Sequence, residues 1–304
     1  MIITRLTGGL GNQMFQYAAG LALAEQHRTV LKLDVSWFKD DPAYEAHNRY
    51  ALSCLNVTEQ FATQAEIEAL SSKPFTKIEI FSARLAKMFH FYRYAEQFKK
   101  YGNLFYDQNY KYDSEFTSQP DFTYLHGDWQ SEKYFSGVSE LLKLHFSFRY
   151  PAPPPVLEME KKISKSSESA FIHFRRGDYL ANPKFKQDLG ILTLDYYHCA
   201  VVELLKRFPN IHFYIFSDDI DAIEREFQPE APHTFVRATK PWHSYDKVRL
   251  MSKCRHGIIA NSTFSWWSAW LMQNPQKIII APRMWRKSDS YDCSDAIPKS
   301  WLRL

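Results

Sequence analysis

The chain has 304 residues, of which 45% are hydrophobic, 16% aromatic and 24% charged. This composition is typical of globular proteins, so it excludes intrinsic disorder, a collagen-like repeat and a coiled coil as descriptions of the whole chain. The net charge of +4 is compatible with an anionic ligand but too small to indicate nucleic-acid binding.

The first residues do not resemble a targeting segment, and no stretch approaches the length of apolar sequence that a membrane-spanning helix needs. The cysteines are widely spaced and form neither a disulfide pattern nor a zinc-binding pattern, which is typical of a reducing compartment. We therefore expect a cytoplasmic protein.

The N-terminal segment reads as the beginning of an α/β unit. The sequence predicts a strand in the first residues, a turn over 8–11, a helix over 12–24 and a second strand over 30–34. The glycine-rich turn is not a dinucleotide-binding fingerprint, because Met14 stands where the third glycine would be. It is not a phosphate-binding P-loop either, but it lets the backbone approach a ligand closely.

Residues 53–112 are less regular. A short helix is expected at 67–70, and residues 78–98 mix basic and aromatic side chains. That mixture fits a helix lying on a membrane surface, or a helical insert packed on the same domain. We favour the insert.

The proline-rich segment 150–155 is expected to be stiff and extended, and it marks a boundary. A second α/β pattern follows it. The predicted fold class is therefore α/β, with an N-terminal domain over 1–150, a C-terminal domain over 151–304 and a ligand in the cleft between them. In the second domain, strands are expected at 170–174, 211–216, 256–260 and 277–282, and helices at 196–207, at 221–227 and from 261–263 through 270.

Polar clusters follow three of these strands, where open α/β sheets bind ligands. After the first, Arg175 and Arg176 offer guanidinium groups suited to phosphate oxygens, and Asp178 could hold one of them in place. The alternative is a structural Arg–Asp pair at the edge of the sheet. His173 lies on the same face of the strand as Arg175.

The segment 261–265 joins a strand to a helix. Its backbone N–H groups and hydroxyls could hold a phosphate, or Asn261 or Ser262 could simply cap the helix. The segment 217–221 allows a Mg²⁺ or Mn²⁺ site at Asp219 and Asp221, a carboxylate that accepts hydrogen bonds from a base such as guanine, or an N-cap of the next helix.

Five segments resemble, in order and spacing, the α-1,2-fucosyltransferases, which transfer fucose from GDP-fucose to galactose. These segments are residues 8–17, 129–135, 173–179, 216–219 and 261–267. The resemblance implies a GT-B-like fold of two Rossmann-like domains, inversion at the fucose carbon and no required metal or other cofactor. The N-terminal domain would be the acceptor side and the C-terminal domain would bind GDP-fucose.

The resemblance also implies roles for individual residues. Arg175 would bind the β-phosphate, His173 and Asp218 would lie near the guanosine, and Ser262 and Thr263 near the phosphates. The catalytic candidates are Arg175, Asp178 and Asn12. The expected donor-binding residues are Gly11, Gln13, His173, Arg175, Asp218, Asn261, Ser262, Thr263 and Phe264.

The expected partners are GDP-fucose and a galactose-terminated oligosaccharide, in O-antigen or other surface-glycan synthesis, with peripheral contact to the inner membrane as an option. Three alternatives stay open. They are an α-1,6-type fucosyltransferase, a metal-dependent glycosyltransferase that uses Asp219 and Asp221, and a carbohydrate-binding protein without enzymatic activity.

Overall fold

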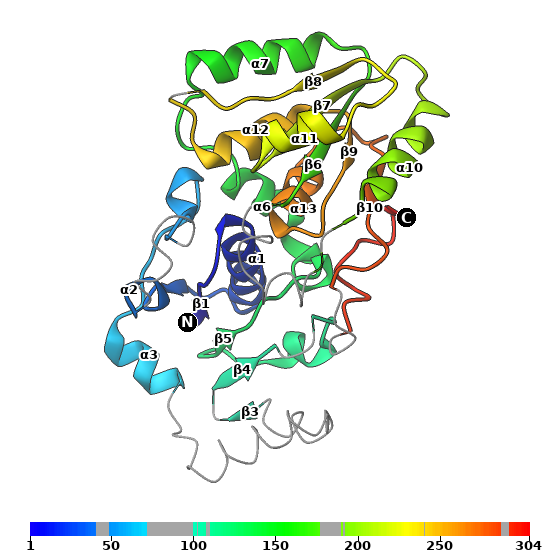
Figure 1. Cartoon of the computed structure of the whole chain (residues 1–304). Helices are drawn as coiled ribbons and strands as arrows, with labels where there is room; N and C mark the ends of the chain where they lie inside the picture. Colours follow the sequence, from blue (N-terminus) through cyan, green and yellow to red (C-terminus); the bar gives the residue numbers. More distant parts are fainter. Residues whose placement is uncertain are drawn as a thin grey trace. The chain divides into compact units, whose positions relative to one another are not determined.

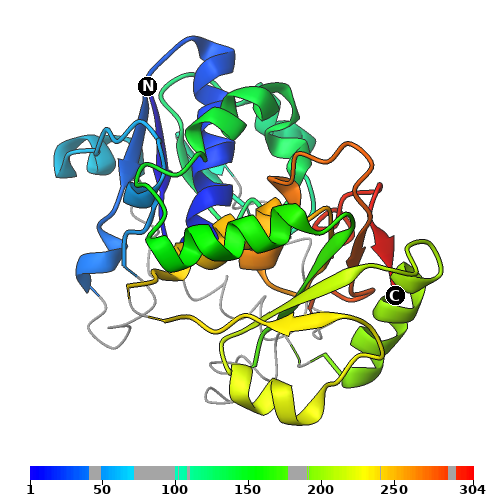
Figure 2. The same ribbon diagram turned by 90° about the horizontal axis from the view of Figure 1, so that it is seen from above.

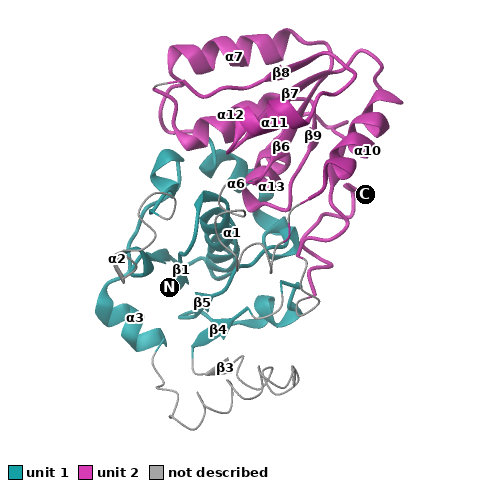
Figure 3. Cartoon of the chain, in the orientation of Figure 1, with its two compact units in different colours: residues 1–147 teal, residues 148–304 magenta. Residues whose placement is uncertain are grey.

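A computed structural model describes residues 1–40, 49–71, 100–101, 103–107, 110–176, 190, 192–239, 241–286 and 292–304. The chain divides into two compact units, Met1–Ser147 and Phe148–Leu304, close to the domain boundary expected at residue 150 (Figure 3). The basic and aromatic segment 78–98 lies outside the described residues, and so does Asp178.

Unit 1 is built on a mostly parallel sheet with the strand order β2-β1-β5-β4-β3, in which β3 alone runs antiparallel to its neighbour. Its long helix α1 packs against β1 and β2 (Figures 1 and 2). The strands are β1 (Ile2–Arg5), β2 (Leu31–Asp34), β3 (Lys100–Tyr101), β4 (Leu104–Tyr106) and β5 (Tyr124–His126). The helices are α1 (Leu10–His27), α2 (Trp37–Asp40), α3 (Gln64–Ser71) and α6 (Ser139–His145), with short 3₁₀ helices at Leu52–Cys54, Ser114–Ser118, Glu132–Tyr134 and Ser136–Val138.

Unit 2 has a fully parallel sheet of six strands in the order β11-β10-β9-β6-β7-β8. Its strands are β6 (Ser169–Phe174), β7 (His212–Ser217), β8 (His233–Phe235), β9 (His256–Ile258), β10 (Ile279–Ala281) and β11 (Leu302–Arg303). Its helices are α7 (Pro154–Lys165), α10 (Leu194–Leu205), α11 (Ile220–Glu226), α12 (Ser244–Lys253) and α13 (Thr263–Trp270). Chain order therefore runs outward from β6 in one direction and then outward from β9 in the other, which is the Rossmann arrangement.

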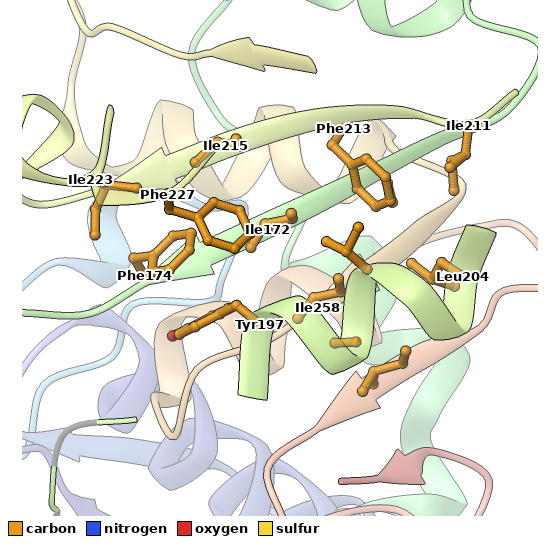
Figure 4. Packing of buried hydrophobic residues seen from close by; sticks show 14 residues of the cluster. Ile172, Phe174, Tyr197, Leu204, Ile211, Phe213, Ile215, Ile223, Phe227 and Ile258 are labelled. Carbon is orange, nitrogen blue, oxygen red and sulfur yellow. The ribbon is translucent and has the colours of Figure 1, made fainter. Parts of the chain in front are cut away.

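The core of unit 2 lies between this sheet and helices α10 and α11. Alternate residues of β6 and β7, such as Ile172, Phe174 and Ile215, point to one face of the sheet and pack against Tyr197 and Leu204 of α10 (Figure 4). The opposite alternation places His173 on the other face, where its ring lies 5.8 Å from the ring of Phe264 in α13. The buried core thus fixes the strand ends that carry the polar clusters.

One expectation about backbone structure was wrong. The segment 150–155 is not extended to its end, because α7 begins at Pro154. Proline is tolerated in the first helical turn, since the backbone N–H that it lacks has no partner within the helix there. In the part of the chain that the structure describes, no helix is both long enough and apolar enough to cross a membrane.

Candidate active site

The polar clusters of unit 2 gather at one edge of its sheet. Strands β9, β6 and β7 are parallel neighbours, so the segments that follow them leave the sheet on the same side. These segments carry Arg175 after β6, Asp218 after β7 and Asn261 after β9. The strand order reverses between β6 and β9, and ligands of open α/β sheets bind at such a switch point.

Arg175 and Asp218 form the centre of this edge. A guanidinium nitrogen of Arg175 lies 3.5 Å from Asp218 Oδ2, and both side chains are only partly exposed. The backbone N–H of Arg176 donates to Asp218 Oδ1 at 3.0 Å. The Arg176 side chain instead pairs with Glu226 of α11. Of the two adjacent arginines, Arg175 is therefore the one whose guanidinium lies at the carboxylate between the two strand ends.

His173 supports this edge from within the sheet. Its side chain is 2% exposed, and its Nδ1 atom has no hydrogen-bond partner among the described residues. Burial, and next the positive charge of Arg175, hold the pKa of His173 far below its usual range. The imidazole is therefore neutral at physiological pH and keeps a nitrogen that can bond to a ligand or a water.

Lys247 belongs to the same cluster, although sequence reasoning did not single it out. Its Nζ atom donates to the carbonyl oxygen of Ser217 at 2.7 Å, at the end of β7. Burial lowers the pKa of Lys247, and the opposing influence of Asp218 is the next largest. A signal was present in the sequence, because Lys247 shares a face of α12 with the buried residues Leu250 and Met251. A charged residue on an apolar helix face indicates a buried partner.

The segment after β9 begins helix α13 without a side-chain cap. Ser262 has the extended backbone of an N-cap residue and is 8% exposed, but its side chain makes no capping hydrogen bond. Asn261 donates from Nδ2 to the carbonyl oxygen of Gly190 at 3.4 Å. Simple capping by Ser262 therefore does not account for these residues, and the start of α13 keeps its capacity to bind an anion.

Asp219 and Asp221 have partners of a structural kind. Asp219 is the N-cap of α11 and accepts from the backbone N–H of Ala222 at 3.2 Å. Asp221 pairs with Arg237, and the hydrogen bond from Arg237 lowers the pKa of Asp221. Within the described ranges, no group of three or more His, Cys, Asp or Glu side chains could hold a metal ion. The N-cap interpretation is thus confirmed for Asp219.

The N-terminal turn lies in unit 1, at the carboxyl end of β1. Gly8 has a φ of +68°, a backbone conformation that residues other than glycine rarely adopt, and Gly9 precedes the first residue of α1. The buried Gln13 donates to the carbonyl oxygens of Gly8 at 2.8 Å and Arg49 at 2.9 Å, and it accepts from the backbone N–H of Ala51 at 2.8 Å. These bonds tie the turn to residues 49–51.

The remaining expected residues divide between the two units. Gly11 and Asn12 lie with Gln13 in the first turn of α1, and the backbone N–H of Asn12 donates to the carbonyl oxygen of Gly9 at 3.0 Å. Thr263 and Phe264 open α13 in unit 2. The structure brings His173, Arg175 and Asp218 together and adds Lys247 to them.

Comparison with known proteins identifies the family. The model of glycosyl transferase family 11 matches residues 1–304. The chain belongs to glycosyl transferase family 11. It is 30% identical to an Escherichia coli alpha-1,2-colitosyltransferase over 100% of this chain and 99% of the relative. It is also 30% identical to the Escherichia coli O-antigen biosynthesis glycosyltransferase WbnK over 98% of this chain and 99% of the relative.

Solved structures of fucosyltransferases are also similar to the chain. The fucosyltransferase NodZ from Bradyrhizobium matches with a TM-score of 0.45 and 13% identity, over 88% of this chain and 91% of that one. Arabidopsis thaliana FUT1 matches with a TM-score of 0.48 and 10% identity, over 95% of this chain and 71% of that one. This family 11 protein is a glycosyltransferase of the α/β class, with a Rossmann-like sheet in unit 2 and a mostly parallel sheet in unit 1.

Proposed function

We propose that the protein transfers L-fucose from GDP-β-L-fucose to the 2-hydroxyl of a galactose residue, with inversion, in the synthesis of an O-antigen or another surface glycan. The observation that carries the proposal is the presence of two cations, Arg175 and Lys247, at the carboxyl edge of β6 and β7. Among the described residues, Arg175 lies 3.5 Å from Asp218, and Lys247 is close enough to both for their charges to influence its pKa. Such an edge suits the diphosphate of a sugar nucleotide.

The chemistry follows from where charge develops. As the bond between the fucose C1 and the diphosphate oxygen breaks, negative charge grows on the β-phosphate. The fixed guanidinium of Arg175 and the N–H groups at the start of α13 would stabilise that charge without a metal. The galactose hydroxyl attacks C1 from the face opposite GDP, which inverts the configuration at C1, and its proton passes to a base in the surrounding water.

The relatives support the surface-glycan context and leave a second donor to consider. One relative at 30% identity is an alpha-1,2-colitosyltransferase, and colitose is fucose without its 3-hydroxyl. GDP-colitose is therefore the second candidate donor. Both donors carry the same diphosphate, so the cationic edge does not distinguish them.

The test is release of GDP from GDP-fucose with lactose as the acceptor, with and without excess EDTA, and with GDP-colitose in a parallel reaction. We expect turnover that EDTA does not change and a product whose NMR spectrum shows an α-1,2 linkage. Turnover abolished by EDTA and restored by Mn²⁺ would contradict the metal-free mechanism. A preference for GDP-colitose would replace fucose as the donor sugar.

A further inference from the structure

The sheet of unit 1 also has a switch point, at the neighbouring strands β1 and β5. From β1 the chain proceeds to β2 on one side, while β5 lies on the other side, and all three strands are parallel. Arg5 is the last residue of β1 and His126 the last residue of β5. Two residues whose side chains can form hydrogen bonds therefore lie at the carboxyl ends of β1 and β5, where a ligand is expected in a sheet of this kind.

The guanidinium of Arg5 has hydrogen-bond donors that no described residue accepts from. Its Nε atom is buried without a hydrogen-bond partner, and no ion pair or hydrogen bond of its side chain is found within the described residues. Asp34 lies opposite Arg5 in the pairing of β1 with β2. However, Asp34 accepts from the backbone N–H of Ser36 at 2.8 Å and from the hydroxyl of Tyr124 at 2.5 Å. A partly buried guanidinium without an acceptor is unfavourable, so an oxygen from outside would be bound well here.

His126 supplies the complementary group. Burial, and next the charge of Arg5, lower the pKa of His126 to about 4, although Asp34 acts in the opposite direction. The ring is therefore neutral at physiological pH and offers both a donor and an acceptor. It lies edge-on to Tyr106, with 4.9 Å between the ring centroids, and makes no hydrogen bond to the described residues.

The charges at this edge select the class of ligand. The positive charge of Arg5 is opposed by the negative charge of Asp34 in the neighbouring strand, so a free anion gains little net attraction. Asp34 has both oxygens engaged, which disfavours a cation. A donor fork beside a neutral imidazole instead suits adjacent hydroxyl groups, which both donate and accept.

We propose that Arg5 and His126 form a binding site for the hydroxyl groups of a neutral sugar, the acceptor of the transfer reaction. The proposal rests on the proposed function in one respect, namely that the acceptor is a sugar. Arg5 donates to the oxygens of the sugar, and His126 exchanges a hydrogen bond with one of its hydroxyls. Both residues bind the acceptor, and neither takes part in binding GDP.

The experiment compares the full-length wild type with the variants Arg5→Gln and His126→Gln. Lys32→Gln is the matched control, because Lys32 lies on the adjacent strand β2 and pairs with Glu66 near the surface. Saturation-transfer NMR measures contact with lactose, steady-state kinetics give the lactose KM, and calorimetry gives the GDP dissociation constant. Thermal melting shows whether each variant is folded. His126→Gln keeps the proposal testable if Arg5→Gln, which removes the larger group, fails to fold.

We expect saturation transfer to lactose in the wild type and in Lys32→Gln, and a loss of most of it in the other two variants. Their lactose KM should rise about tenfold or more, while the GDP dissociation constant stays within about twofold. Absence of saturation transfer in the wild type, or unchanged lactose contact in both variants, would overturn the proposal. A wild type that contacts lactose but does not release GDP from GDP-fucose would instead refute the proposed donor, and the sugar site would stand.

Discussion

The two parallel sheets end in carboxyl edges of different electrostatic character. Among the described residues of unit 2, two cations, Arg175 and Lys247, lie near the carboxylate of Asp218. In unit 1, one described cation, Arg5, lies opposite one carboxylate, Asp34. On this basis we proposed a site for an anion in one sheet and a site for a neutral ligand in the other, although both sites lie at the carboxyl ends of parallel strands. The difference lies in the side chains at the strand ends.

The largest effect is expected from Arg175→Ala. Loss of a fixed cation that stabilises developing charge should lower kcat by ~10²–10³. Arg237→Ala, which removes an arginine paired with Asp221 and Glu224 on the surface, is the control and should retain most activity. Steady-state kinetics measure both. Survival of more than about a tenth of the wild-type turnover in Arg175→Ala would remove Arg175 from this role.

Gln13→Met tests whether Gln13 only stabilises the N-terminal turn or also contacts the donor. The variant leaves the buried carbonyls of Gly8 and Arg49 without their donor, so the free energy of unfolding should fall by about 2 kcal/mol. Urea denaturation measures the change, and Gln64→Met on the exposed side of α3 should leave stability within about 0.5 kcal/mol. Unchanged stability together with a raised KM for GDP-fucose would instead place Gln13 in contact with the donor.

Lys247→Met tests the second cation of the unit 2 edge. The change removes a charge near Asp218 and the hydrogen bond to the carbonyl oxygen of Ser217, and it shortens the side chain by only one atom. We expect the GDP dissociation constant to rise about tenfold, which corresponds to about 1.4 kcal/mol. Calorimetry measures it, with Lys253→Met at the exposed end of the same helix as the control. Equal GDP affinity in the two variants would leave Lys247 with a purely structural role.

The smallest effect concerns the pH dependence of stability. The pKa of His126 is lowered to about 4 in the folded protein, so between pH 6.5 and about 4 the unfolded chain binds a proton that the folded chain does not. The contribution of His126 to the free energy of unfolding is fully present above pH 6.5 and decreases as the pH falls. At pH 5.5 the free energy of unfolding should be lower by about 1 kcal/mol for this reason. His126→Gln should flatten this part of the profile in urea melts. An identical slope in the variant would show that His126 titrates normally.

The sequence predicts much of the local structure. Strand 170–174 appears as β6 and the helix after Asn261 as α13, because alternation and helical spacing are local properties of the chain. The turn at Gly8 is equally local, since its positive φ is a property of its own backbone, and its nearest side chain, that of Asn12, is four residues away in the chain. The motif around Arg175 identifies the family for the same reason, because the spacing of its residues can be read directly from the chain.

Other features needed the tertiary structure. Ser217 accepts from Lys247, 30 residues away in the chain, and Asp34 accepts from Tyr124 across 90 residues. Local patterns do not specify such pairs, because they depend on which strands become neighbours. The strand orders decide this, and they decide which polar side chains share an edge.

The sequence by itself thus determined the α/β class, the family and the residues that follow each strand. Only the tertiary structure decided which of these residues keep unused charge or hydrogen-bonding capacity. It engages Asp219 in a helix cap and Gln13 in a turn, and it leaves the Nε atom of Arg5 without a partner in the described chain. The physical reason is that a polar group's availability depends on every neighbour that burial brings to it, and those neighbours are distant in the chain.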